Sequence, residues 1–310
     1  ILLLNPDTLI SETTLLRCMQ FLQAHTQSGA AGVKMLNGNG RFLPESKRSY
    51  PHPFTALLKL TGLAALFPNS AFMNRYALSA LPSNAVQEVP ILSGAFMMAK
   101  CKVLKQVGGF DEQFFMYAED IDLSRRIEQA GYKNYYIGTV SIVHFKGKST
   151  HRYSWKRLSY FYGTMHLFVK KYYAKQIFLQ AILHLGIILK ALANILALPV
   201  LKFKESIFAE KKQSVQQTIL IGSSTDIAEA VHRFETYFHN KTLQLWYSSE
   251  KLPVTSTSYR HTEIVFCIGY FTYGEAIQLL PHFQKAVSIK WFHTKANSLI
   301  ANNANAILSF

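Results

Sequence analysis

Cysteine, acidic side chains and low-complexity sequence are all scarce in this chain of 310 residues. The three cysteines, Cys18, Cys101 and Cys267, lie far apart and form no CxxC pair, which excludes a disulfide framework and a cysteine-based zinc site. Only 16% of residues are charged while 49% are hydrophobic, which excludes a disordered or collagenous chain. The length allows two domains of about 150 residues each, and the cysteine usage fits a reducing, cytosolic compartment.

An initiating methionine is also absent, as are the charged segment and small-residue cleavage site of a signal peptide. The chain opens on residues 1–4, an apolar run that has the pattern of a buried strand already under way. We therefore expect this sequence to be the later part of a longer protein.

The 18 acidic residues stand against 33 Lys plus Arg, and the net charge of +15 is unevenly spread. Residues 151–213 hold 11 basic and two acidic side chains, and they contain the most apolar run, residues 177–201. Seven lysines flank that run: Lys170, Lys171, Lys175, Lys202, Lys204, Lys211 and Lys212. Basic residues that bracket an apolar segment are typical of contact with anionic lipid, whereas nucleic-acid surfaces interleave basic and stacking side chains. The pattern predicts an anionic membrane surface as a partner and no nucleic acid.

Residues 177–201 are long enough for a helix that spans a bilayer or lies in its interface. Four polar residues fall in an arc of about 120° at roughly 100° per residue: Gln180, His184, Lys190 and Asn194. This stripe would face headgroups or a partner helix, with Leu183, Ile187 and Leu196 toward lipid. A buried helix packed between two domains is the alternative. Pro199 is predicted to end the helix.

The apolar opening is followed directly by the polar loop Asn5-Pro6-Asp7-Thr8. The carboxyl end of a strand buried on both faces is where open α/β sheets bind ligands. Asp7 could hold a divalent cation on a nucleotide diphosphate there, because hard cations prefer carboxylate oxygens. A simple turn, with Asp7 or Thr8 capping a helix over residues 9–23, is the alternative.

Residues 92–109 have the pattern of a strand entered through Ser93-Gly94, a short helix and a Gly-Gly turn. Residues 119–129 predict a second helix, closed by Gly131. Its first turn carries three carboxylates, a placement that the helix dipole alone would favour: Glu119, Asp120 and Asp122. A general base also needs a carboxylate fixed at a cleft, and Asp120 borders the inner face of the helix while Asp122 points away from it.

His144 follows two short predicted strands, 135–138 and 140–143, and begins a basic loop that contains Lys148. An imidazole at a strand end beside a basic Gly-Ser loop suits a metal and phosphate site. A histidine satisfied within the surface or the core is the alternative.

Together these residues resemble the bacterial inverting glycosyltransferases of family 2, particularly the rhamnosyltransferase-like branch. The resemblance covers residues 1 to about 150 and rests on six motifs: Leu3-Leu4-Asn5-Pro6-Asp7, Ser93-Gly94-Ala95, Gly108-Gly109-Phe110-Asp111-Glu112 with Phe114-Phe115, Tyr117-Ala118-Glu119-Asp120-Ile121-Asp122-Leu123 with Arg126, Gly131-Tyr132, and His144 with Gly147 and Ser149. It implies a GT-A fold, of which residues 1–150 would form the C-terminal part, a nucleotide-diphosphate sugar donor, and a divalent cation, Mn²⁺ or Mg²⁺.

The resemblance also implies roles for individual residues. Asp120 matches the base that deprotonates the acceptor hydroxyl for attack with inversion, and Asp7 matches a metal carboxylate, with His144 as a second ligand. Six further residues are expected to bind donor or acceptor: Asn5, Ser93, Gly94, Glu119, Arg126 and Lys148. Asn5 departs from the family pattern, because it replaces the first carboxylate of an Asp-x-Asp motif.

The implied activity is hexosyl or rhamnosyl transfer to a glycan or lipid-linked acceptor, in the synthesis of envelope polysaccharide at the cytoplasmic face of the bacterial inner membrane. Family members carry a further N-terminal portion that grips the base and ribose of the donor. Because nothing upstream of Ile1 is in this sequence, we expect this part alone to be inactive. The loss of a carboxylate at Asn5 keeps open an alternative, a non-catalytic GT-A-like scaffold that recruits envelope enzymes to the membrane.

Residues 214–310 alternate strand and helix patterns. Strands are predicted at 218–221, 243–247, 264–268 and 287–292, and helices at 226–238 and 273–283. This alternation predicts a small parallel α/β domain of Rossmann type. Gly222-Ser223-Ser224 lacks the later glycines of a dinucleotide-binding loop, which favours a structural or partner-binding role over nucleotide binding. The predicted class is therefore α/β: a partial GT-A domain (1–150), a basic apolar helical segment (151–213) and a Rossmann-like domain (214–310).

Overall fold

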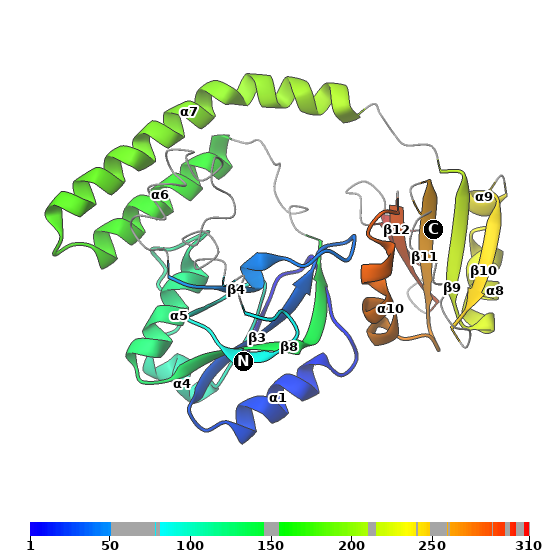
Figure 1. Ribbon diagram of the computed structural model, residues 1–310, viewed down its shortest axis with the longest axis horizontal. Coiled ribbons are helices and arrows are strands. Elements are labelled where there is room, and N and C mark those ends of the chain that lie inside the picture. The colour runs from blue at the N-terminus through cyan, green and yellow to red at the C-terminus, as the bar shows by residue number, and fades with distance from the viewer. Residues whose placement is uncertain are drawn as a thin grey trace.

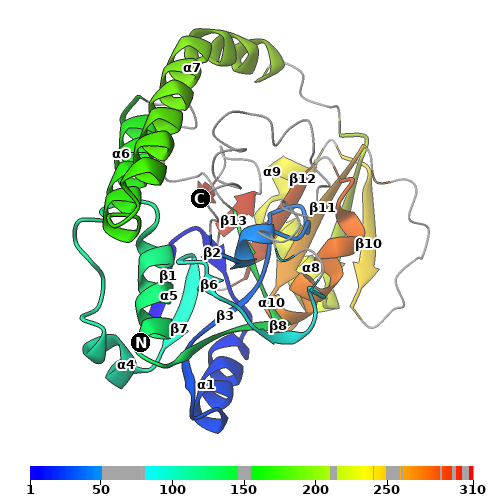
Figure 2. The ribbon, with the colours of Figure 1, turned by 60° about the vertical axis from the view of Figure 1, so that its left-hand side comes forward.

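The computed structural model describes residues 1–50, 78, 81–145, 155–209, 215–239, 241–248, 259, 261–286, 288–294, 298–301 and 307–309. Two six-stranded sheets lie side by side, and a pair of long helices extends along the outside of the first (Figures 1 and 2). The mixed α/β class predicted from the sequence is confirmed.

The first sheet has the order β1-β7-β3-β8-β2, with β5 also paired to β8. Only β3 and β8 run parallel among its described pairs, and the others are antiparallel. Its strands are β1 (Leu2–Leu4), β2 (Thr8–Leu9), β3 (Ser28–Leu36), β5 (Val86–Glu88), β7 (Phe96–Ala99) and β8 (Lys133–His144). A two-stranded ribbon of β4 (Lys47–Arg48) and β6 (Ile91–Leu92) lies beside it, and a short 3₁₀ turn, η1 (Pro44–Ser46), precedes β4.

Helices cover both faces of this sheet. Helix α1 (Thr14–Ala24) buries Cys18 and Leu22 against alternate residues of β3, while α4 (Cys101–Gln106) and α5 (Glu119–Gln129) pack on the opposite face. The small residues of β3 allow this close approach: a Cβ placed on Gly29 would lie 2.4 Å from the Ile127 side chain of α5. The helix bounds and Gly-Gly turn predicted over residues 92–131 agree with this arrangement.

The opening of the chain differs from its prediction in two ways. Among the described strands, β1 lies at the edge of the sheet and pairs with β7 alone. Its residues are half-buried or exposed, so it is not buried on both faces. The following helix begins at Thr14, because Thr8 and Leu9 pair with His144 and Val143 as a short strand. The two strands predicted before His144 are one continuous strand, β8, with a register shift in its pairing to β3.

Helices α6 (Trp155–Tyr172) and α7 (Ile177–Ala209) form an antiparallel hairpin. Leu183 and Ile187 are buried against α6, so the expectation that they face lipid was wrong. The predicted polar stripe also meets α6, where the amide of Asn194 donates to the hydroxyl of Tyr162 at 2.6 Å. Helix α7 therefore turns its polar stripe toward α6 and its wide apolar face outward.

Helix α7 runs through Pro199 to Ala209, so the prediction that this proline ends the helix was wrong. A proline inside a helix removes one backbone hydrogen bond and bends the axis, and α7 is visibly curved (Figure 1). By length and composition, residues 177–197 form the one helix among the described residues that could cross a membrane. Only 17% of that stretch is buried, which argues against a core helix between two domains.

The second sheet has the order β10-β9-β11-β12-β13-β14. Its first four strands are parallel, and β13 and β14 extend the edge in antiparallel fashion. The elements are β9 (Gln217–Gly222), α8 (Ser224–Arg233), α9 (Glu235–Phe238), β10 (Leu243–Tyr247), β11 (Thr262–Ile268), α10 (Tyr273–Leu279), the 3₁₀ turn η3 (Leu280–Phe283), β12 (Ser288–His293), β13 (Ser298–Ala301) and β14 (Ile307–Ser309). In chain order the parallel strands lie 2-1-3-4, a doubly wound arrangement of the flavodoxin kind.

The two sheets share one hydrophobic cluster. Leu9, Leu36 and Val143 of the first unit pack with Ile277 and Leu280 of the second. The carboxylate of Glu12 accepts hydrogen bonds from the first backbone amides of α10, at 2.9 and 3.1 Å. The second unit is therefore docked directly behind the β2–β8 edge (Figure 2).

Candidate active site

Asp120 lies in the first turn of α5, and its Oδ2 atom has two partners. The guanidinium of Arg48 donates to it at 2.5 Å, and the backbone amide of Gly94 donates at 3.1 Å. The side chain is 14% exposed. A Cβ on Gly94 would lie 3.3 Å from the Cβ of Asp120, so the loop approaches the helix this closely because residue 94 is glycine.

The loop Ser93-Gly94-Ala95 connects this carboxylate to the start of the chain. The backbone amide of Asn5 donates to the carbonyl of Ala95 at 3.0 Å, and the buried Ser93 hydroxyl accepts from the Ala95 amide at 3.3 Å. The predicted residues Asn5, Ser93, Gly94 and Asp120 are thus brought together through one loop.

The turn that leads into α5 has an uncommon backbone. Tyr117 and Ala118 have φ values of +69° and +58°, in the left-handed region that costs a non-glycine residue about 1 kcal/mol or more. Glu119 follows, and its Oε2 atom is buried with no hydrogen-bond partner among the described residues. Burial raises the pKa of Glu119, and the neighbouring Asp120 charge raises it further. Backbone strain and a buried acid with one unpaired oxygen next to Asp120 are typical of a functional site.

Asp7 and His144 are also brought together, as the family resemblance implied. His144 Nε2 lies 3.2 Å from Asp7 Oδ1, both side chains are largely buried, and the Phe145 amide donates to the Asp7 carbonyl at 2.9 Å. The remaining ring nitrogen, Nδ1 of His144, is buried without a hydrogen-bond partner in the part of the chain that the structure describes.

This pair can be tested against the predicted divalent cation. Two ligand atoms at about 2.1 Å from one Mg²⁺ lie about 3 Å apart at right angles, which agrees with the separation of Asp7 and His144. Within the described residues, no group of three or more His, Cys, Asp or Glu side chains could hold a metal. Asp7 and His144 would thus supply two of the ligands of such a cation.

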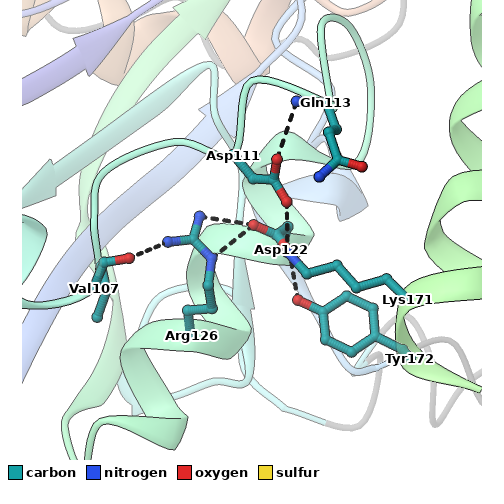
Figure 3. A network of polar contacts seen from close by, with 7 residues as sticks. All are labelled: Val107, Asp111, Gln113, Asp122, Arg126, Lys171 and Tyr172. Atoms are coloured by element: carbon teal, nitrogen blue, oxygen red, sulfur yellow. Dashed lines mark hydrogen bonds and ion pairs between the residues drawn. The ribbon is translucent and has the colours of Figure 1, made fainter.

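Asp122 is the centre of a second polar cluster (Figure 3). Its side chain is 1% exposed and accepts from Arg126 Nε at 2.8 Å, from Lys171 Nζ at 2.5 Å and from the Tyr172 hydroxyl at 2.5 Å. Asp122 does point away from the inner face of α5, but helix α6 covers that side, so the side chain is buried. Lys171 also contacts Asp111 at 2.7 Å and holds the pKa of that carboxyl below its usual range.

Two predicted binding residues lie apart from Asp120 or outside the described chain. The guanidinium of Arg126 contacts Asp122 and, at 2.5 Å, the Val107 carbonyl, and the structure does not bring it to Asp120. Lys148, with the Gly147 and Ser149 of its motif, lies outside the described residues.

Sequence reasoning missed Arg48, Lys171 and Tyr172. Arg48 lies on a two-residue strand with no local pattern, so only its contact with Asp120 identifies it. Lys171 was assigned to a basic flank, and its partner Asp122 to the side of the helix that points away from the inner face. No spacing rule links residues 122 and 171, because helix packing brings them together.

Comparison with known proteins agrees with the motifs. Residues 1–209 match the family described as "Glycosyl transferase family group 2". The chain is 28% identical over 152 residues to an N-acetylglucosaminyl-diphospho-decaprenol L-rhamnosyltransferase of Mycobacterium tuberculosis (strain ATCC 25618 / H37Rv), covering 49% of this chain and 48% of that protein. It is 26% identical over 145 residues to Rhamnosyltransferase WbbL of Escherichia coli (strain K12), covering 47% and 52%. The chain spans about half the length of the curated relatives it matches. It belongs to glycosyltransferase family 2, is similar to that family's rhamnosyltransferases, and contains a GT-A-like transferase domain.

Proposed function

We propose that the full-length protein transfers a hexosyl or rhamnosyl group from a nucleotide-diphosphate donor to a glycan or lipid-linked acceptor, with inversion, in the synthesis of cell-envelope polysaccharide. The observation that carries this proposal is the position of Asp120, at a strained helix start and in contact with Gly94 and Arg48. The names of the two relatives, both rhamnosyltransferases, support the choice of sugar class.

In the proposed reaction, the carboxylate of Asp120 accepts the proton of the acceptor hydroxyl. The acceptor oxygen forms a bond to the anomeric carbon as the bond to the donor diphosphate breaks on the opposite face. The diphosphate leaves with the electron pair of that bond, and the configuration inverts. Both contacts that the described residues make with Asp120 fall on Oδ2, so we assign Oδ1 as the oxygen that takes the proton.

We propose that Asp7 and His144 hold a divalent cation, Mn²⁺ or Mg²⁺, together with diphosphate oxygens of the donor. Such a cation offsets negative charge on the departing diphosphate. The separation of 3.2 Å and the otherwise unpaired His144 ring support this role. Asn5, Ser93, Gly94 and Glu119 surround Asp120 and are proposed to bind donor or acceptor, whereas the contacts of Arg126 favour a structural role. Lys148 stays a prediction.

We also propose that the α6–α7 hairpin attaches the protein to the cytoplasmic face of the bacterial inner membrane. Large apolar side chains of α7 point outward, with Leu185 58% and Leu196 78% exposed. Lysines precede this face, and an interfacial helix of this kind meets anionic lipid. The relative from M. tuberculosis is named for a decaprenol-linked substrate, which supports a lipid-linked acceptor here.

The test is a screen of nucleotide-diphosphate sugars with the full-length protein and an undecaprenyl-diphosphate-linked sugar as acceptor. Transfer that disappears in the Asp120→Asn variant supports the proposal. Full-length protein that binds acceptor vesicles but transfers no sugar from any donor would overturn it. That outcome favours the non-catalytic scaffold, for which Asn5 in place of an aspartate is the specific argument.

A further inference from the structure

Helices α5 and α6 are joined by a set of charges centred on the buried side chain of Asp122 (Figure 3). The carboxylate is 1% exposed and meets two cations, Arg126 of its own helix and Lys171 of α6. The Tyr172 hydroxyl donates to it as well, at 2.5 Å. Lys171 bridges onward to Asp111 in the loop that precedes α5. The end of α6 is thus fixed to both the loop and the first turn of α5.

The strained turn before α5 is held by α6 too. The Thr164 hydroxyl donates to the Met116 carbonyl at 2.9 Å, directly before the left-handed pair at 117 and 118. Two aromatic pairs lie alongside, with ring centroids 5.6 Å apart for Phe115 and Tyr160 and 5.5 Å for Tyr117 and Phe161. An energetically costly backbone persists only where its surroundings enforce it, and here α6 supplies those contacts.

Asp120 and Asp122 lie on the same helical turn but face different partners. Asp120 faces Gly94 and Arg48, whereas Asp122 faces α6. Because one rigid turn of backbone carries both carboxylates, a rotation or shift that α6 imposes through Asp122 also moves Asp120. A displacement of about 1 Å at a reacting group can cost about 100-fold in rate.

We propose that Lys171 and Tyr172 are positioning residues that set the carboxylate of Asp120 through Asp122, so that the α6–α7 hairpin and the base are oriented as one unit. This inference rests on the proposed role of Asp120. Burying an ion pair is a poor source of stability, because desolvation offsets most of the attraction between the charges. Its value here is a fixed orientation of the turn that begins at Glu119.

The proposal gives the hairpin a role beyond attachment. The same two helices carry the exposed apolar face of α7 and the contacts that hold the turn before Asp120. Catalysis therefore requires that α6 packs correctly against α5, and residues far from the substrate control this packing.

The experiment compares Lys171→Met and Tyr172→Phe with Lys156→Met, a matched control. Lys156 lies on the same helix as Lys171, has the same charge, is exposed and is not among the lysines assigned to membrane contact. In the full-length protein we expect Lys171→Met to lower kcat about 10- to 100-fold with the donor KM within about twofold, and Tyr172→Phe to act in the same direction. Lys171→Arg should restore most of the rate. Lys156→Met should leave kcat unchanged.

A second readout does not depend on activity. Hydrogen exchange at the backbone amides of residues 117–122 should be faster in Lys171→Met than in Lys156→Met, while exchange in β3 stays unchanged. A kcat for Lys171→Met within twofold of wild type in a folded protein, or equal effects of the two lysine variants, would overturn the proposal. If Asp120→Asn keeps the wild-type rate, the proposed base fails instead, and the exchange result stands on its own.

Discussion

The Asp7 carboxylate lies 3.2 Å from the His144 imidazole because Thr8 and His144 are register partners in β2 and β8.

Replacing Asp7 with Ala should weaken donor affinity in Mn²⁺ or Mg²⁺ about 10- to 100-fold and have little effect when EDTA is present. The reason is that only the contact bridged by the cation is removed. Titration calorimetry with the donor in full-length protein measures both affinities. Glu112→Ala, which changes an exposed loop acid, is the control. Equal losses with and without metal would indicate a folding defect or a direct sugar contact.

Replacing Asp120 with Asn should lower turnover by about two to four orders of magnitude and leave donor binding nearly unchanged. The amide keeps the size of the side chain and can still accept from Gly94, but it cannot take a proton. Initial rates and donor calorimetry on the full-length protein separate the two effects. If the variant keeps more than half the wild-type rate, the assignment of Asp120 as the general base is wrong.

Replacing Glu119 with Gln should stabilise the protein at neutral pH while reducing activity. Because burial raises the pKa of Glu119 in the folded state, its contribution to stability is fully present below the unfolded pKa and is lost as pH rises through the folded pKa. The amide of Gln stays neutral at every pH. The gain in Tm over wild type should therefore be absent near pH 4 and present at pH 7 to 8. Replacing an active-site acid commonly stabilises a protein in this way. Thermal unfolding at the two pH values tests this, and an equal gain at both would contradict it.

Replacing Leu185, Leu189 and Leu196 with Ser should reduce sedimentation of full-length protein with vesicles that contain anionic lipid, even at high salt. These three side chains are exposed on the outer face of α7, so their loss removes apolar contact with lipid. Leu183→Ser is the comparison: that side chain is buried against α6, and its change should lower Tm instead. Wild-type protein that stays in the supernatant at low salt would refute membrane attachment.

Replacing Lys170, Lys175, Lys202 and Lys204 with Gln should weaken the salt-sensitive part of vesicle binding by about 1 kcal/mol for each charge near the surface. The effect should vanish as the Debye length falls below the separation between lysines and headgroups. Sedimentation at increasing NaCl measures it. Lys171 is left unchanged because it is held by Asp111 and Asp122. Identical salt curves for variant and wild type would contradict the electrostatic contribution.

The sequence predicted those elements whose signals are local. Helix α5 was predicted over its observed bounds because Gly131 follows its last turn, and its φ of +86° is the value that such a glycine provides. Strand β10 was likewise found as observed. The meeting of Asp7 and His144 was implied by the family resemblance, whereas the pairing of β2 with β8 that brings them together and the edge position of β1 were not predicted.

Features that depend on distant partners could not be predicted. Asp122 is buried because α6 covers it, and Leu183 is buried because α7 folds back on α6. Periodicity along one helix cannot say which side its neighbour will cover. The continuation of α7 through Pro199 also escaped prediction, since a proline bends a helix as readily as it ends one.

The shared cluster behind the β2–β8 edge has a practical consequence for dissecting this protein by deletion. Any shortened version that stops before residue 214 exposes three apolar side chains at this edge, Leu9, Leu36 and Val143, the last of which directly precedes His144 on β8. It also removes the helix start that Glu12 caps. Such a version is prone to aggregate or to unfold locally at this edge. A loss of activity in it would therefore reflect poor solubility and not the loss of a catalytic group. Point changes on the Glu12 contact, which leave both sheets whole, are the cleaner way to ask what the second unit does for the first.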